Sequence, residues 1–144
     1  MILIDVNVFV YAFDRDCSQH AEYRRWVEGV LNGEEPHHIS DQILAAVVRI
    51  STHPKIFKRP STLAEALEYV RMLRAQPNGV TVSPGERHWE IFMRLCQKAD
   101  ARGNLITDAW FAALAIESGS EWITADRDYA RFPGLKWRHP FDQR

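Results

Sequence analysis

The stretch that determines the expected fold is residues 2–10, with the sequence ILIDVNVFV. Its first three residues are large and apolar, which is typical of a short buried strand. The strand should end at Asp5, which is followed by more apolar residues and so lies in a segment that should be buried. A buried carboxylate costs free energy unless it is paired or binds a metal ion. Asp5 is therefore the first candidate for a functional side chain.

Outward from this stretch, short apolar runs alternate with helical patterns along the chain. Further strands are expected at residues 38–40, 80–82, 122–124 and 135–137. Apolar residues at helical spacing, together with capping and stop signals, predict helices at 18–31, 41–51, 63–76, 84–102 and 108–118, and a short helical turn near Asp128. Alternating strands and helices predict an α/β fold: a three-layer α/β/α sandwich with a mostly parallel central sheet.

The bulk composition indicates one globular domain over residues 1–144. The chain has 144 residues, 46% of them hydrophobic and 26% charged, which is ordinary for a folded domain with a substantial core. Its net charge of −1 excludes a general affinity for polyanions, so any nucleic-acid binding must come from local patches.

The expected location is the cytoplasm, with no membrane contact. No stretch approaches the roughly 18 apolar residues that a membrane-spanning helix needs. Cys17 and Cys96 are far apart in the sequence and form no CxxC motif, which is typical of reduced thiols in a cytosolic protein.

Three acidic residues from distant parts of the chain are expected at one edge of the sheet. Asp5 follows the first strand, Asp126 comes two residues after the fourth, and Asp108 stands at the start of a predicted helix. Ligands of open parallel sheets bind beyond the carboxyl ends of the strands. Carboxylates without His or Cys partners suit a hard cation, Mg²⁺ or Mn²⁺, which lowers the pKa of a bound water and offsets charge on a phosphoryl group.

Each acid also has a purely structural interpretation. Asp108 behind Thr107 favours the dipole of the helix that begins there. Asp126 and Asp128 are common turn and cap residues. Only Asp5, because of its apolar surroundings, resists this interpretation.

Basic residues near the predicted pocket are candidates for contacts with phosphates. Arg49 and Lys55 lie in a stretch without acids between Asp41 and Glu65, and Arg127 lies between two acids of the predicted site. They either bind the backbone of a nucleic acid or form a solvated charged face. In the same stretch, Phe57 is a candidate for stacking on a base.

Several motifs, in order, resemble the PIN-domain family, and within it the VapC-like toxins. They are IDVNVFVYA at 4–12, STHPKIF at 51–57, GNLITDA at 103–109, AALA at 112–115 and ITADRDY at 123–129. Together they extend over almost the whole chain.

The resemblance implies an acidic pocket that holds Mg²⁺, hydrolysis of single-stranded RNA, homodimerisation and inhibition by a VapB-like antitoxin. Carried over by position, Asp5, Asp108 and Asp126 match family acids that bind metal and carry catalysis. The neighbouring polar or acidic positions of the family are matched by Asn7, Thr124 and Asp128.

One departure puts the activity in doubt. The family usually has a Glu in the helix after the second strand, and Ala46 stands there. Asp41 lies about one helical turn earlier, and we expect it to substitute in part for the missing Glu. In a second interpretation, three acids and a single metal ion suffice for activity. In a third, Ala46 inactivates the site. A second hypothesis is therefore a catalytically weakened module that binds RNA or antitoxin. A third hypothesis is a phosphohydrolase that acts on small substrates. It requires a second acid at the position of Asn7, so the sequence argues against it.

Overall fold

The computed structural model describes residues 1–143. The elements run in the order β1 (Ile2–Ile4), α1 (Val6–Phe13), α2 (His20–Asn32), β2 (His37–Ile39), α3 (Asp41–Ser51), α4 (Leu63–Arg74), β3 (Gly79–Thr81), α5 (His88–Lys98), α6 (Asn104–Ser118), β4 (Glu121–Ile123), the 3₁₀ helix η1 (Arg127–Arg131) and β5 (Trp137–Arg138). Each strand overlaps one that the sequence predicts.

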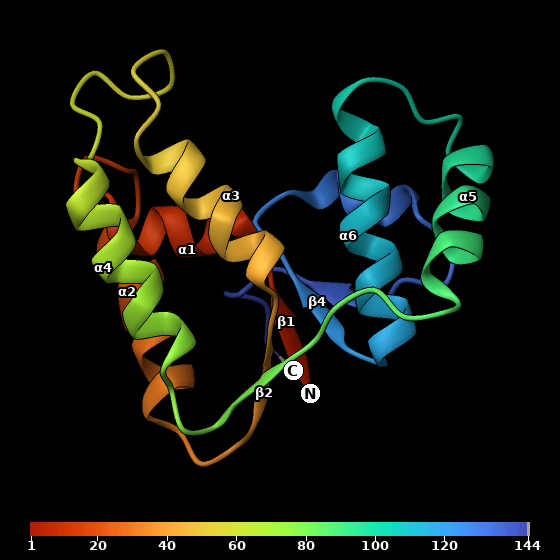
Figure 1. Cartoon of the computed structure of the whole chain (residues 1–144), viewed down its shortest axis with the longest axis horizontal. Helices are drawn as coiled ribbons and strands as arrows, with labels where there is room; N and C mark the ends of the chain where they lie inside the picture. The colour runs from red at the N-terminus through yellow and green to blue at the C-terminus, as the bar shows by residue number, and fades with distance from the viewer. Residues whose placement is uncertain (144) are drawn as a thin grey trace.

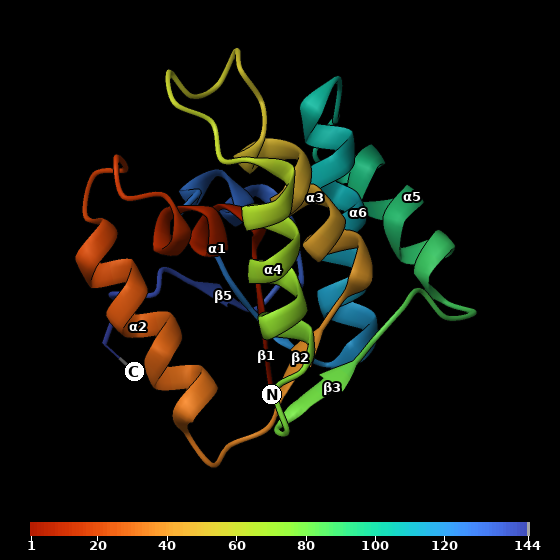
Figure 2. The ribbon, with the colours of Figure 1, turned by 60° about the vertical axis from the view of Figure 1, so that its left-hand side comes forward.

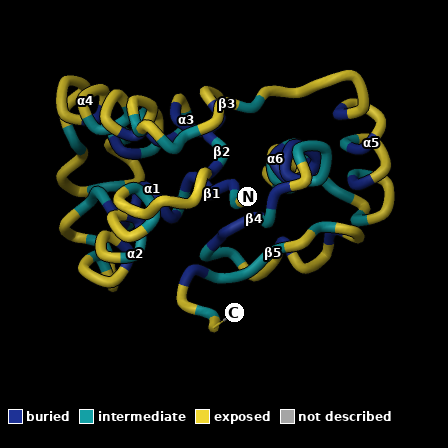
Figure 3. Tube along the Cα trace, turned by 90° about the horizontal axis from the view of Figure 1, so that it is seen from below, coloured by how far each residue is buried: buried dark blue, intermediate teal, exposed yellow. Residues whose placement is uncertain are grey.

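The five strands form one sheet in the order β3-β2-β1-β4-β5, and every neighbouring pair is parallel. Helices α1 to α4 lie on one side of it and α5 and α6 on the other (Figures 1 and 3). This confirms the predicted three-layer α/β/α architecture. The chain adds β2 and β3 on one side of β1 and then returns to place β4 on the other. The strand order therefore reverses between β1 and β4, and such a switch point is where open sheets bind ligands.

The core fills both sides of the sheet: α1, α2 and α3 contribute buried residues on one side, and α6 does so on the other. Trp122 and Ile123 of β4 are fully buried, and α6 contributes a run of buried residues from Phe111 to Ala115. Four of the six buried residues of α6 are alanines, so its backbone comes close to the sheet and to α5. Figure 3 shows the resulting contrast between the buried centre and the exposed outer helices.

The helix α1 was not predicted from the sequence. Its residues Val6, Val8, Phe9, Val10 and Ala12 are all buried, so no polar face marks a helical period. Its start is fixed by the Asp5 carboxylate, which accepts a hydrogen bond from the Val6 backbone N–H at 2.7 Å. Asp5 is thus an N-cap, a structural role that the sequence analysis did not consider.

Helix α5 begins later than predicted, at His88 instead of Pro84. The cause is Glu117 of α6, whose carboxylate accepts hydrogen bonds from the backbone N–H groups of Gly85 at 2.7 Å and Arg87 at 3.0 Å. These bonds hold the preceding residues in a turn. A Cβ atom at Gly85 would stand 2.8 Å from a Glu117 oxygen, so a larger residue there would displace the Glu117 carboxylate from these bonds.

Helix α6 begins earlier than predicted, at Asn104 instead of Asp108. Gly103, with a φ of 59°, precedes α6 and does not close α5, which already ends at Lys98. Asp108 consequently lies inside the helix and not at its start, where we had expected it to interact with the helix dipole. Between residues 1 and 143, none of the helices combines the length and the apolar character needed to span a bilayer.

Candidate acidic site at the carboxyl edge of the sheet

A pocket of about 600 Å³ opens beyond the carboxyl ends of β1 and β4 and is lined in part by residues of α3 and α6. Its lining includes the three acids that the sequence singles out, Asp5, Asp108 and Asp126. They come from the end of β1, from α6 and from the segment after β4. The fold therefore brings together side chains that are 121 residues apart at the extremes.

Asp5 is the most buried of the three, with 5% of its surface exposed. Both of its carboxylate oxygens accept hydrogen bonds, Oδ1 from the Val6 N–H and Oδ2 from the Thr124 hydroxyl, each at 2.7 Å. Burial raises the pKa of Asp5 to about 7; Thr124 and Val6 oppose this rise, and the charges of Asp108 and Asp126 add to it. A buried carboxylate with two further acids nearby is well placed to attract a cation.

Thr124 connects the ends of β1 and β4. Besides donating to Asp5, its hydroxyl oxygen accepts hydrogen bonds from the Asp126 backbone N–H at 3.0 Å and from the Asn7 side chain at 3.4 Å. The amide oxygen of Asn7 in turn accepts from the Ala125 N–H at 3.3 Å. Asn7 and Thr124, both predicted to support the site, thus join the two segments that carry Asp5 and Asp126.

Asp126 and Asp108 have separate anchors. Asp126 caps η1 by accepting a hydrogen bond from the Asp128 backbone N–H at 2.9 Å. Asp108 accepts one from the Tyr129 hydroxyl at 3.2 Å. Burial raises the pKa of Asp108, Tyr129 opposes the rise, and the charges of Asp126 and Asp128 increase it. Asp128 itself is exposed and lies outside the pocket lining.

Asp41 does not substitute for the missing Glu, contrary to our expectation. Ala46 lines the pocket, as expected for the position of that Glu, but Asp41 does not. The Asp41 carboxylate accepts hydrogen bonds from Arg74 of α4 at 2.8 and 3.3 Å, and these bonds hold its pKa below the ordinary value. Asp41 stands at the first residue of α3 and pairs with α4, so it brings no carboxylate to Ala46.

The three basic residues predicted to contact phosphates, Arg49, Lys55 and Arg127, have different surroundings in the structure. Arg49 lines the pocket, one helical turn after Ala46. Lys55 lies in the exposed loop between α3 and α4, outside the lining. From that loop it is Ile56 that reaches the pocket, whereas Phe57, the predicted stacking residue, packs partly buried against the core.

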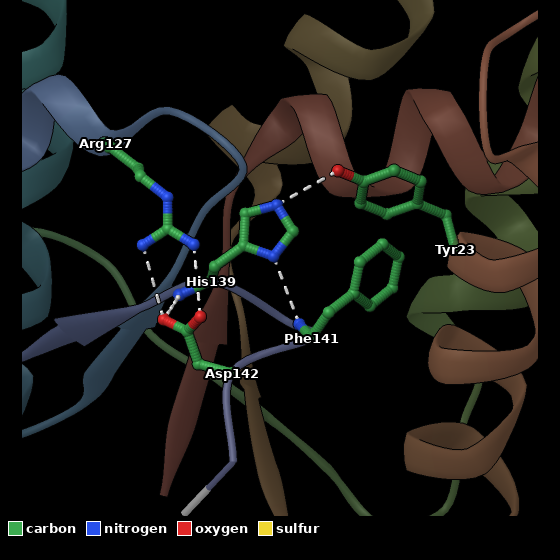
Figure 4. A network of polar contacts seen from close by, with 5 residues as sticks. All are labelled: Tyr23, Arg127, His139, Phe141 and Asp142. Carbon is green, nitrogen blue, oxygen red and sulfur yellow. Dashed lines mark hydrogen bonds and ion pairs between the residues drawn. The ribbon is translucent and has the colours of Figure 1, made fainter.

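Arg127 is outside the pocket lining, and its side chain points toward Asp142 in the C-terminal segment (Figure 4). Its guanidinium pairs with Asp142 at 3.1 Å, and Asp142 also accepts a hydrogen bond from the His139 N–H at 3.1 Å. The His139 ring lies 3.3 Å from the Tyr23 hydroxyl of α2, and Phe141 packs against the Tyr23 ring. Arg127 thus links the segment that carries Asp126 to the C-terminal residues that pack on α2. In this conformation it is not free to make the phosphate contact that we had predicted.

The pocket suits a hard divalent cation in its chemistry. Over residues 1–143, no three His, Cys, Asp or Glu side chains are close enough together to form a ready metal centre. The three acids nevertheless offer only oxygen donors, which Mg²⁺ and Mn²⁺ prefer. Burial is the main cause of the raised pKa of Asp5 and Asp108, and a cation between them would offset both this burial cost and the smaller repulsion between the acids. The residues therefore fit such an ion, provided that their side chains shift to enclose it.

Comparison with known proteins identifies the family. The model of the PIN domain matches residues 2–135, and the chain belongs to the PIN-domain family. Within that family it is similar to Ribonuclease VapC43 of Mycobacterium tuberculosis, with 43% identity over 142 residues, 99% of this chain and 97% of the relative. It is 37% identical to Ribonuclease VapC25 of the same species over 140 residues, 97% of this chain and 99% of the relative. The predicted resemblance to VapC-like toxins is confirmed.

Two solved structures share the fold at low sequence identity. One is VapBC2 from Rickettsia felis, bound to a DNA fragment from its promoter, with a TM-score of 0.70, 17% identity and coverage of 96% of this chain and 98% of that chain. The other is VapBC-1 from nontypeable Haemophilus influenzae, with a TM-score of 0.69 and 17% identity. The match covers 99% of this chain and 100% of that chain. Both support the α/β/α architecture.

Proposed function

We propose that this chain is a metal-dependent endoribonuclease, the toxin of a toxin–antitoxin pair, that hydrolyses single-stranded or loop RNA. The observation that carries the proposal is the meeting of Asp5, Asp108 and Asp126 in one pocket at the switch point of the sheet. The relatives named as VapC ribonucleases, similar over nearly the full chain, support it.

Asp5, Asp108 and Asp126 would hold one Mg²⁺, for which Mn²⁺ can substitute. When bound, such an ion lowers the pKa of a coordinated water and stabilises negative charge that develops on the phosphate. Asp5 must be ionised to take part, and its pKa of about 7 places that ionisation near neutral pH. Asn7 and Thr124 keep the Asp5 and Asp126 segments in register through the hydrogen bonds described above.

The RNA backbone would be held by basic side chains at the pocket mouth. Arg49 lines the pocket and is placed to contact a phosphate next to the acids. Lys55 extends this positive surface along the loop between α3 and α4, which projects from the body of the protein (Figure 2). Residues 52–62 of that loop contain no acid, so nothing there repels RNA.

The proposed partners are a VapB-like antitoxin and a second copy of the chain, in the cytoplasm. The neighbouring structures named VapBC support an antitoxin partner. Trp89 and Met93 of α5 expose apolar surface, which supports a homodimer.

Ala46 favours an alternative, in which the chain is a weakened module that binds RNA or antitoxin with little turnover. Its methyl group lines the pocket where the family has a carboxylate, and Asp41 is bound elsewhere. Under this alternative the pocket binds RNA but does not cleave it.

The test is cleavage of an end-labelled single-stranded RNA in Mg²⁺, compared with the same reaction in chelator and with a duplex of the same sequence. We expect metal-dependent cleavage of the single strand, lost in Asp108→Asn. The exposed Asp100→Asn, which makes the same change outside the pocket, is the matched control and should stay active. Binding of the single strand without cleavage would support the alternative, and neither binding nor cleavage would refute both.

A further inference from the structure

The three pocket acids share one feature beyond their location: each accepts a hydrogen bond from the short segment 124–129. The Thr124 hydroxyl donates to Asp5, the Asp128 N–H donates to Asp126, and the Tyr129 hydroxyl donates to Asp108. The first two donors are Thr124, which was predicted to support the site, and a backbone group. The third, Tyr129, was not predicted to have any role at the site.

The Tyr129 side chain is held rigidly. Only 2% of its surface is exposed, and its ring packs between Trp122, at a centroid distance of 5.4 Å, and Phe132, at 5.7 Å. Its hydroxyl emerges from this apolar surrounding at the pocket wall, 3.2 Å from Asp108 Oδ1. A buried tyrosine hydroxyl needs a partner, and here the partner is a carboxylate of the candidate site.

Asp108 depends on this contact for its orientation. Asp5 has two hydrogen-bond donors and Asp126 has a backbone N–H, whereas Tyr129 is the one donor found for the Asp108 carboxylate within residues 1–143. Asp108 is carried by α6, and besides the charge attraction of Arg131 the Tyr129 hydroxyl is its hydrogen-bonded link, within residues 1–143, to the segment after β4. With Oδ1 engaged by Tyr129, Oδ2 is left for a ligand in the pocket.

We propose that Tyr129 is a positioning residue, whose hydroxyl fixes the Asp108 carboxylate for binding of a divalent cation together with Asp5 and Asp126. The inference rests on the proposed function. Groups that orient a ligand of a metal ion typically change metal affinity by roughly 10- to 100-fold when they are removed. Tyr129 acts through Asp108 and touches neither the cation nor the RNA.

The experiment is Mn²⁺ binding by calorimetry to the full chain, in the wild type, Tyr129→Phe and Tyr69→Phe. Tyr129→Phe keeps the packed ring and removes only the hydroxyl. Tyr69→Phe is the matched control, because it removes a buried hydroxyl that donates to the Phe9 carbonyl at 2.8 Å, outside the pocket. We expect Mn²⁺ to bind about 10-fold more weakly to Tyr129→Phe and with unchanged affinity to Tyr69→Phe.

A second readout separates positioning from general loosening of the fold. The electron paramagnetic resonance spectrum of bound Mn²⁺ should change in Tyr129→Phe at saturation and stay unchanged in Tyr69→Phe. Equal affinity of the wild type and Tyr129→Phe would overturn the inference and leave the proposed function standing. An equal loss in both variants would also overturn it, and absence of Mn²⁺ binding in the wild type would reject it together with the proposed metal dependence.

Discussion

The Thr124 hydroxyl donates a hydrogen bond to Asp5 Oδ2 at 2.7 Å, across 119 residues of sequence. Thr124 is completely buried and Asp5 nearly so. The bond joins the segments that follow β1 and β4, the two strands between which the sheet order reverses. The geometry of the acidic pocket thus depends on a contact between the two halves of the fold.

Thr124→Val tests this contact. The change keeps the shape of the side chain but removes the donor to Asp5 and the acceptor for the Asp126 N–H. We expect the free energy of unfolding to fall by about 2 kcal/mol, because two buried polar groups lose a partner. Urea unfolding measures this, and Thr124→Ser, which keeps the hydroxyl, should lose much less. Equal losses in both variants would show that the methyl group matters as much as the hydroxyl, and would contradict this expectation.

Asp5→Asn should make the metal-free protein more stable at high pH. The folded-state pKa of about 7 lies above the ordinary 3.8, so the fold favours protonated Asp5. Its contribution is therefore complete below pH 3.8 and is lost as the pH rises through 7. The loss is at most about 4 kcal/mol. In chelator, the variant should melt at a higher temperature than the wild type at pH 8 and at a similar one at pH 4.

The same variant distinguishes a functional from a structural Asp5. Asparagine also caps helices well, so the start of α1 should survive the change. If Asp5→Asn melts below the wild type at pH 8 in chelator, the carboxylate serves the fold, and its pKa is not raised.

Ala46→Glu should restore the family pattern. The new carboxylate would enter the pocket near Asp5 and Asp108, where it adds an oxygen ligand for a cation. We expect Mn²⁺ to bind more tightly and RNA to be cleaved faster, by about 10-fold or more. In chelator we expect a lower melting temperature, because like charges in the pocket repel one another. Ala46→Gln, similar in size but uncharged, is the control. Unchanged cleavage in Ala46→Glu would show that three acids already suffice.

Leu114→Asp should prevent folding. Leu114 is 1% exposed and lies in the middle of α6, between the sheet and α5. An unpaired carboxylate there costs several kcal/mol, a large part of the stability of a domain of this size. Circular dichroism during thermal unfolding measures the effect. A cooperative transition near that of the wild type would contradict the described packing of α6.

Local sequence signals predicted the elements that have a polar and an apolar face. Helix α3 begins and ends at the predicted residues 41 and 51, since Ser40 caps it and its apolar stripe is clear. Helix α1 was missed because Asn7 is its one strongly polar residue, and a helix without a clear polar face resembles a buried strand in sequence.

Contacts between distant residues set the limits of prediction for the site. Three acids were placed at one edge by the simple rule that parallel strands end together. Asp41 was misplaced because its orientation is set by Arg74, 33 residues away, and not by its helical spacing from Ala46. Tyr129 was missed because its hydroxyl meets Asp108 only in the folded chain, 21 residues away in sequence.

The most direct test of the nuclease proposal is cleavage of total tRNA in Mn²⁺ by the wild type and by Asp5→Asn, with both proteins shown to be folded. The account predicts discrete fragments with the wild type, none in chelator and none with Asp5→Asn. Intact tRNA in every reaction, or equal cleavage by both proteins, would contradict the claim that the acidic pocket is the centre of a metal-dependent ribonuclease.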